Sequence, residues 1–207
     1  DATDGQGPAF SSVSLTSNNA STTLATVGDV VTLAFTVTGS TGSPVVTIAG
    51  NSVTPTSTGG DGWSATYTML SGDTAGALSF SAVAADAVPN YTTSTASTDG
   101  SSVTFDKTAP GTPVISTSAQ STSASTIVIS GTADAGSTVS ISGGASTVTG
   151  TAVAGNYSIT VTLTQNTANT LSVTASDGAG NTSEASTVII THQAAASGGS
   201  SGGGSGG

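Results

Sequence analysis

The chain has 207 residues, and only 6% of them are charged: ten aspartates and one glutamate stand against one lysine and no arginine, so the formal net charge is −10. This balance argues against nucleic-acid binding, because neutralising phosphates requires clustered Lys and Arg. It also disfavours binding to an anionic membrane surface, and no apolar run approaches the 18 residues of a membrane span. Because the chain has no cysteine, disulfides and cysteine-based zinc sites are excluded.

The first hundred residues show the alternation of apolar and polar side chains that is typical of β-strands. The clearest strand is expected at residues 30–37, where Val31, Leu33, Phe35 and Val37 fall on one face. Further strands are predicted at 10–15, 45–48, 63–69, 78–83 and 102–105, after a leading linker at 1–8. Trp63 lies on an alternating strand, which favours a core position over an exposed platform for stacking sugars.

A short stretch at residues 103–113 separates this block from a second one, which has the same strand-like sequence. It ends a strand and then presents Asp106, the only lysine of the chain, Lys107, and the prolines Pro110 and Pro113. Proline fixes φ and biases the preceding residue toward extended backbone, so we predict a short, stiff hinge with Asp106 at the joint. Lys107 is expected to make a solvated local contact with Asp106.

The second block consists of six to seven predicted short strands, separated by turns of Gly, Asn and Asp. The strands are expected at 114–115, 126–130, 138–141, 146–149, 157–163, 170–174 and 187–190. This spacing implies a β-sandwich, and helix is expected to be near zero. Residues 197–207 contain only Ser and Gly, which predicts a flexible tail, either a spacer to a further domain or a segment added for expression.

Several motifs resemble the tandem bacterial immunoglobulin-like (Ig-like) domains of large surface adhesins and other secreted multidomain proteins. In the second block they are ISGTADAGSTV at 129–139, GNYS at 155–158 and VTASDGAGNTS at 173–183. The first block resembles a sister type through PVVTIAG at 44–50, GWSATYTM at 62–69 and VTFDKTAP at 103–110. Its loop DAVPN at 86–90 departs from the family pattern, because Val88 and Pro89 replace Ala and Gly.

The resemblance implies an all-β fold of two tandem Ig-like Greek-key β-sandwiches, joined by the short Pro-containing hinge and followed by a disordered Gly/Ser tail. The expected domains are residues 1–106 and 107–193, with the tail at 194–207. The composition, rich in Ser, Thr, Gly and Asp, together with the resemblance, favours an exported bacterial protein that is extracellular or on the cell surface.

A calcium site is predicted where an Ig-like topology brings scattered acids together. In that topology the start of the first strand, the B–C loop and the F–G loop share one pole. Asp134 would lie in the B–C loop and Asp177 and Asn181 in the F–G loop, while Asp106 enters from the hinge. Such an oxygen-rich set suits Ca²⁺, and no soft ligand favours zinc or copper.

A second, weaker calcium site is predicted at the start of the first domain from Asp4, Asp86 and Asn90. For both sites the alternative stays open that the Asp and Asn residues are ordinary turn formers, whose side chains bond their own backbone. The only histidine, His192, stands alone near the end of the last strand, where a tail position is expected.

No catalytic residues are predicted, because a Ser nucleophile would need a base and His192 offers no plausible triad. The leading hypothesis is a non-catalytic structural extender of an adhesin-like protein, with a hinge stiffened by calcium. Two alternatives stay open: a module that binds glycans or proteins, and a subunit of an extracellular filament or surface layer. The expected partners are neighbouring domains of the same chain, and other surface proteins, glycans or copies of itself under the alternatives.

Overall fold

A computed structural model describes residues 5–88 and 90–195, and all regular elements within these ranges are β-strands. The all-β prediction is therefore confirmed. Asp4 and the Gly/Ser segment 196–207 lie outside the described residues. In the part of the chain that the structure describes, no helix is long and apolar enough to cross a membrane.

The chain divides by its internal contacts into two compact units. The first unit extends to Thr108 and also includes the short segment Gly178–Asn181, and the second comprises Ala109–Asp177 and the residues from Thr182 onward. Each unit has its own hydrophobic core.

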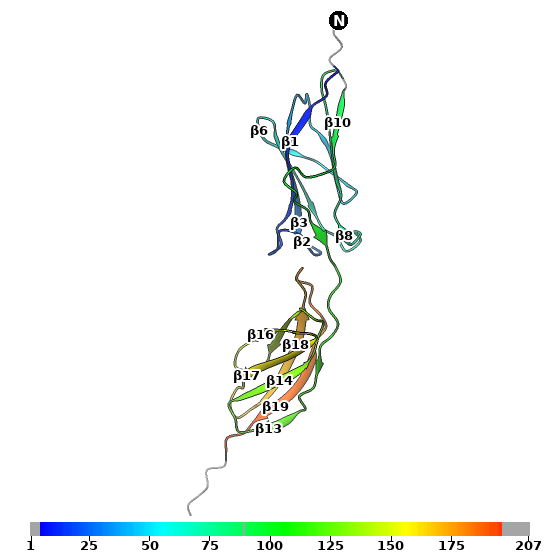
Figure 1. The fold of residues 1–207 in the computed structure, drawn as a ribbon. Coiled ribbons are helices and arrows are strands. Elements are labelled where there is room, and N and C mark those ends of the chain that lie inside the picture. The colour runs from blue at the N-terminus through cyan, green and yellow to red at the C-terminus, as the bar shows by residue number, and fades with distance from the viewer. Residues whose placement is uncertain (1–4, 89, 196–207) are drawn as a thin grey trace, which may run out of the picture. The chain divides into compact units, whose positions relative to one another are not determined.

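Three sheets form the first unit (Figure 1). Its strands are β1 (Ala9–Ser17), β2 (Leu24–Ala25), β3 (Val30–Thr38), β4 (Val45–Ile48), β5 (Asn51–Val53), β6 (Thr56–Gly59), β7 (Gly62–Thr68), β8 (Gly76–Ala77), β9 (Phe80–Ala85), β10 (Tyr91–Ser94) and β11 (Thr104–Phe105). One sheet has the order β1-β3-β7-β6 and another β10-β9-β4-β5, both antiparallel. In the small third sheet, β11 pairs in parallel with β2 and antiparallel with β8.

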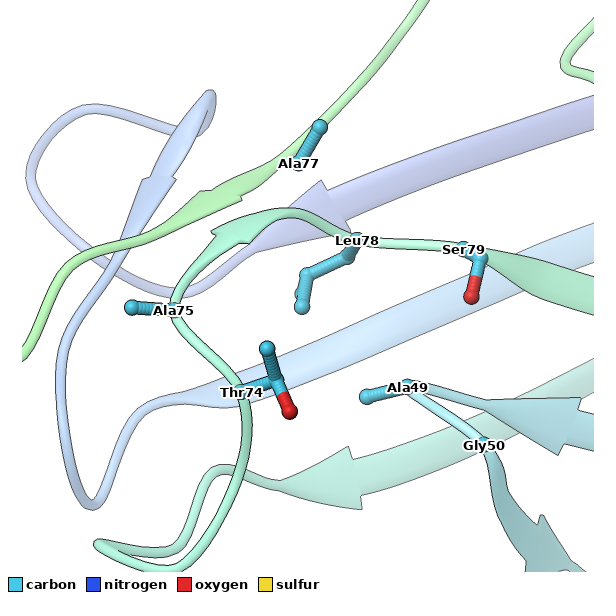
Figure 2. A pocket seen from close by; sticks show the side chains of 7 residues that line it. All are labelled: Ala49, Gly50, Thr74, Ala75, Ala77, Leu78 and Ser79. Carbon is cyan, nitrogen blue, oxygen red and sulfur yellow. The ribbon is translucent and has the colours of Figure 1, made fainter.

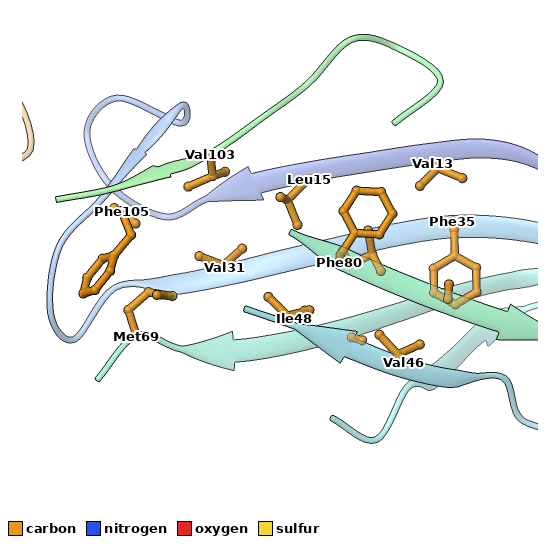
Figure 3. Packing of buried hydrophobic residues seen from close by; sticks show 14 of the residues in the cluster. Val13, Leu15, Val31, Phe35, Val46, Ile48, Met69, Phe80, Val103 and Phe105 are labelled. Atoms are coloured by element: carbon orange, nitrogen blue, oxygen red, sulfur yellow. The ribbon is translucent and has the colours of Figure 1, made fainter. Parts of the chain in front are cut away.

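The core of the first unit lies between its two larger sheets. Val31, Leu33, Phe35 and Val37 on β3 are all buried, as the alternation predicts, because every second side chain of a strand points to the same face. Figure 3 shows buried side chains of β3 beside those of the opposite sheet, such as Ile48. Burying each of these apolar side chains is worth about 1.5–3 kcal/mol.

Trp63 belongs to this packing and does not form a surface platform. It lies on β7 opposite Phe35 of β3 and packs, partly buried, against the core cluster. The preference for a core position over a sugar-stacking face therefore agrees with the structure.

Two sheets form the second unit. Its strands are β12 (Val114–Ile115), β13 (Gln120–Thr122), β14 (Thr126–Thr132), β15 (Thr138–Ser142), β16 (Val148–Thr151), β17 (Asn156–Thr162), β18 (Ala168–Ser176) and β19 (Ser186–His192). The sheets have the orders β12-β14-β17 and β13-β19-β18-β15-β16. The chain crosses from one sheet to the other between β14 and β15, between β16 and β17, and between β17 and β18, which is the Ig-like arrangement.

The same tight turn occurs once in each unit. Ala49 and Gly50 join β4 to β5 with φ of 52° and 78°. Ala154 and Gly155, with φ of 49° and 80°, lie between the bridged residues Val153 and Asn156, directly before β17. Positive φ at both central residues defines a type I′ turn, which prefers Asn-Gly. In each case the following asparagine donates from Nδ2 to the alanine carbonyl O, at 3.1 Å.

Replacing Ala154 with asparagine should stabilise the second unit by about 0.5–1 kcal/mol, because asparagine tolerates the left-handed region better than alanine. Ala154 is exposed, so the larger side chain meets no packing conflict. The measurement is urea unfolding of both proteins. Ala154→Val is the matched control and should be destabilised, since a β-branched side chain is strained at this φ; equal stability of the two variants would contradict the argument.

Candidate metal centre

Two of the four predicted calcium ligands flank one end of the second unit. Asp134 lies in the loop before β15 and Asp177 directly follows β18, and the two strands pair from Thr138 and Ser176 onward. The Oδ2 atom of Asp134 accepts a hydrogen bond from the main-chain N–H of Gly111 at 2.8 Å. The carboxylate of Asp134 thus holds the segment that leads into β12.

The other two predicted ligands, Asp106 and Asn181, belong to the first unit. The Nδ2 atom of Asn181 donates to the main-chain O of Asp106 at 3.0 Å, and its Oδ1 atom accepts from the hydroxyl of Thr26. The Oδ1 atom of Asp106 accepts from the N–H of Thr108 at 2.9 Å, a local turn contact. Asp106 therefore has the turn-forming role that was kept as the alternative, and Asn181 contacts its main chain.

The donor set has the right chemistry for calcium, since every member offers hard oxygen atoms. Within residues 5–88 and 90–195, however, no group of three or more His, Cys, Asp or Glu side chains is arranged to hold a metal ion. The four predicted ligands are split evenly between the units. The calcium site stays a prediction.

Asp86 and Asn90 of the weaker predicted site do lie together, while Asp4 is outside the described residues. The Oδ2 atom of Asp86 accepts from Nδ2 of Asn90 at 2.9 Å, and its Oδ1 atom accepts from the N–H groups of Val88 and Asn90, each at 2.9 Å. These donors, the Asn90 side chain first, lower the pKa of Asp86 below its ordinary value. The carboxylate of Asp86 thus accepts hydrogen bonds from residues of its own loop, as an ordinary turn former does.

A polar cluster that no sequence motif indicates surrounds Asp73 in the first unit. The Oδ1 atom of Asp73 accepts from the hydroxyl of Tyr67 at 3.0 Å and from Nδ2 of Asn51 at 3.3 Å, and Oδ2 accepts from the N–H of Leu70 at 2.8 Å. Burial first, and then the hydrogen bond to Asp73, raises the pKa of Tyr67 above its ordinary value of 10.0. Three donors therefore converge on one carboxylate.

Lys107 joins this cluster instead of contacting Asp106, so its predicted local contact is wrong. Its Nζ atom donates to the main-chain O atoms of Ser71 and Asp73 at 2.9 and 2.8 Å. The sequence signalled only that Lys107 is the sole cation of the chain. It could not point to the partners, because every residue carries a main-chain carbonyl.

Replacing Asp73 with asparagine should lower the pKa of Tyr67 toward 10.0, but only in part, because the burial of Tyr67 remains. In the native protein the phenolate is disfavoured, so the folded state keeps its proton to higher pH than the unfolded state. The contribution of Tyr67 to stability is therefore complete below about pH 10 and is lost as the pH rises through the raised pKa. Absorbance titration of the tyrosines measures this, with Tyr67→Phe to assign the signal; an unchanged titration in the Asp73 variant would contradict it.

His192 is structural. It ends β19 with 4% of its surface exposed, and its Nδ1 atom accepts from the N–H of Asn166 at 2.9 Å. The expected tail position is therefore wrong. This hydrogen bond helps to hold Asn166, which has a positive φ of 55°, in the turn between β17 and β18.

A shallow hollow of about 270 Å³ lies in the first unit beside the turn between β4 and β5 (Figure 2). It is lined by Ala49, Gly50, Thr74, Ala75, Ala77, Leu78 and Ser79. The lining side chains include two hydroxyls and no titratable group, so this hollow offers no general acid or base.

Comparisons with known proteins agree with this architecture. A family model described as a bacterial Ig domain matches residues 109–192. The chain is similar to fibronectin(III)-like modules of Clostridium thermocellum CbhA, with 16% identity and a TM-score of 0.50, over 87% of this chain and 94% of that one. A search of curated protein sequences found no match.

Two adhesin structures are also similar, both with a TM-score of 0.47. One is a 1.5-MDa bacterial ice-binding adhesin, at 24% identity over 92% of this chain and 66% of that one. The other is a Ca²⁺-stabilized adhesin with which an Antarctic bacterium binds ice, at 26% identity over 90% of this chain and 50% of that one. This chain thus spans about two thirds of the first adhesin chain and half of the second.

The likeness to the fibronectin(III)-like modules shows the fold, a β-sandwich of the Ig type. The family match falls on the block that carries the GTADAGSTV, GNYS and DGAGNTS motifs, so the resemblance inferred from these residues is confirmed. Residues 109–192 match the model of the bacterial Ig domain family.

Proposed function

We propose that the chain is a non-catalytic extender module of a bacterial adhesin-like protein, which is secreted or displayed on the cell surface. The observation that carries this proposal is the pair of separate hydrophobic cores, one in each β-sandwich unit. Modules that each bury their own core can be strung along a chain, so they can set a distance between two ends without any chemistry of their own. The predicted domains, 1–106 and 107–193, are the modules in this proposal.

The partners proposed for these modules are the neighbouring domains of the same chain. The residue chemistry supports export to the outside of the cell: no cysteine needs protection from oxidation, and a net charge of −10 keeps the surface soluble. The motifs that resemble those of bacterial Ig-like surface domains support the same location.

Calcium is part of the proposal because the sequence motifs predict an oxygen-rich set of side chains at one pole of an Ig-like domain. Asp106, Asp134, Asp177 and Asn181 would supply the carboxylate and amide oxygens. A bound divalent cation would offset the repulsion among the carboxylates and tie their loops together. The chain has one lysine and no arginine against eleven acids, so most of the negative charge would have to be offset by a cation from outside the chain.

Calcium titration during thermal unfolding tests this. If calcium binds the folded chain at a hundred times its dissociation constant, it stabilises by about 2.7 kcal/mol, and for a domain of this size the melting temperature should rise by about 10 °C or more. Asp134→Asn should remove most of the rise. Asp61→Asn, which removes the same charge from an exposed turn, should keep it.

Magnesium at the same concentration is the ion control, because it demands a smaller, octahedral site. If the melting temperature is equal in calcium and in EGTA, the calcium part of the proposal is contradicted, and an extender module that binds no calcium remains. Assembly of the chain with rising concentration, measured by light scattering, would instead favour the filament alternative.

A further inference from the structure

The only cation of the chain is fixed at the point where the chain leaves the first unit. Lys107 follows β11, and its Nζ atom donates to two carbonyl oxygens, those of Ser71 and Asp73, at 2.9 and 2.8 Å. A charged donor makes stronger hydrogen bonds than a neutral one. A lysine that only needed solvation would gain nothing from this geometry, since water satisfies its three donors at no cost in side-chain entropy.

The loop that Lys107 contacts is held in place by Asp73. The carboxylate of Asp73 accepts from Tyr67 on β7, from Asn51 on β5 and from the N–H of Leu70. All three partners are donors, so an ionised carboxylate satisfies them and a side-chain amide cannot. The loop that carries the two carbonyl groups is thus held by bonds that do not involve Lys107.

The backbone around Lys107 is bonded as well. The N–H groups of Thr104 and Asp106 donate to the carbonyls of Thr23 and Ala25 at 2.9 and 2.8 Å. The N–H of Thr108 donates to the side chain of Asp106 at 2.9 Å. Both the side chain and the flanking main chain of Lys107 are therefore engaged within the first unit.

We propose that the bonds from Lys107 to the carbonyl O atoms of Ser71 and Asp73 form a clasp, which fixes the segment where the chain leaves the first unit. The clasp also keeps a protease from the only trypsin-type cleavage site of the protein. Trypsin-type proteases take a lysine or arginine side chain into an acidic pocket, and Lys107 is the single residue of either kind. Cleavage after Lys107 requires both carbonyl contacts and the neighbouring main-chain bonds to open first, so its rate reports local opening. The carbonyl groups that bind Lys107 belong to Ser71 and Asp73, which are not among the predicted calcium ligands, so the proposal does not rest on calcium binding or on the extender role.

A trypsin time course on the full chain tests the clasp directly, because only the bond between Lys107 and Thr108 can be cut. The native protein should be cut slowly, and Asp73→Asn, which releases the carbonyl loop, should be cut at least tenfold faster. Asp61→Asn is the matched control: it makes the same change of charge in an exposed turn between β6 and β7 and should be cut at the native rate. Trp63 fluorescence verifies that each variant keeps the fold of the first unit.

Hydrogen exchange supplies a second readout that does not depend on Asp73. In Lys107→Met the amide protons of Asp106 and Thr108 should exchange at least fivefold faster than in the native chain, while those of β3 stay unchanged. If Asp73→Asn unfolds the first unit, this measurement alone decides. Trypsin rates within twofold for the two aspartate variants, or unchanged exchange in Lys107→Met, would overturn the proposal.

Discussion

Gly131→Ala should destabilise the second unit by about 3 kcal/mol or more, enough to unfold a marginal domain. Gly131 lies on β14, in the middle of the sheet β12-β14-β17. A Cβ atom there would lie 1.9 Å from the main-chain O of Val114 and 2.6 Å from the hydroxyl O of Tyr157. Neither atom can withdraw freely, because the Tyr157 hydroxyl donates to that same carbonyl at 3.2 Å.

The measurement is urea unfolding of the native chain and the variant, followed by far-UV circular dichroism. Gly42→Ala is the control, because a Cβ atom at Gly42 would meet open space and its φ is not in the left-handed region. The control should change stability by less than about 0.5 kcal/mol, as surface substitutions usually do. A loss below about 1 kcal/mol in Gly131→Ala would mean that β12 can move away from β14 at little cost.

Truncating one core residue should destabilise only the unit that contains it. Leu33 of the first core and Leu171 of the second are both fully buried, and the two clusters share no residue. Leu33→Ala and Leu171→Ala should each cost about 2–5 kcal/mol, from lost burial and from the cavity left behind. The two variants form a reciprocal pair, each serving as the control for the other.

Trp63 makes this test simple, because the only tryptophan packs against the first core. Leu33→Ala should shift the denaturant midpoint seen by Trp63 fluorescence, and Leu171→Ala should leave that midpoint in place while shifting part of the circular dichroism transition. A fluorescence midpoint that moves equally in both variants would show that the units unfold as one, and would remove the basis for treating them as modules in series.

The strands that the sequence predicted are those with a strong apolar period. Residues 30–37 and 157–163 alternate clearly and correspond to β3 and β17. Six strands of two to four residues were missed: β2, β5, β6, β8, β10 and β13. Two of them, β6 and β13, have the sequences TSTG and QST, which contain no large apolar side chain, and none of their residues is buried. Such strands lie at sheet edges, where main-chain pairing holds them in place and no hydrophobic period is required.

The site residues divide in a similar way. Asp134 and Asp177 were placed at one end of the second unit from their positions in the motifs, and the pairing of β15 with β18 agrees. The roles of Asp73 and Lys107 could not be inferred, because the donors and acceptors that meet there come from β5, β7, the loop at 70–73 and the segment after β11.

The all-β class, the alternating core strands and the Ig-like motifs can be read from the residues alone, because a two-residue period and a turn motif are local properties of a chain. Three other features became visible only in the folded chain: Gly131 has no room for a Cβ atom, His192 is buried, and Lys107 binds two distant carbonyl groups. Each of these depends on main-chain atoms brought close by folding, and main-chain atoms are the same in every residue, so no pattern of side chains records which of them will meet.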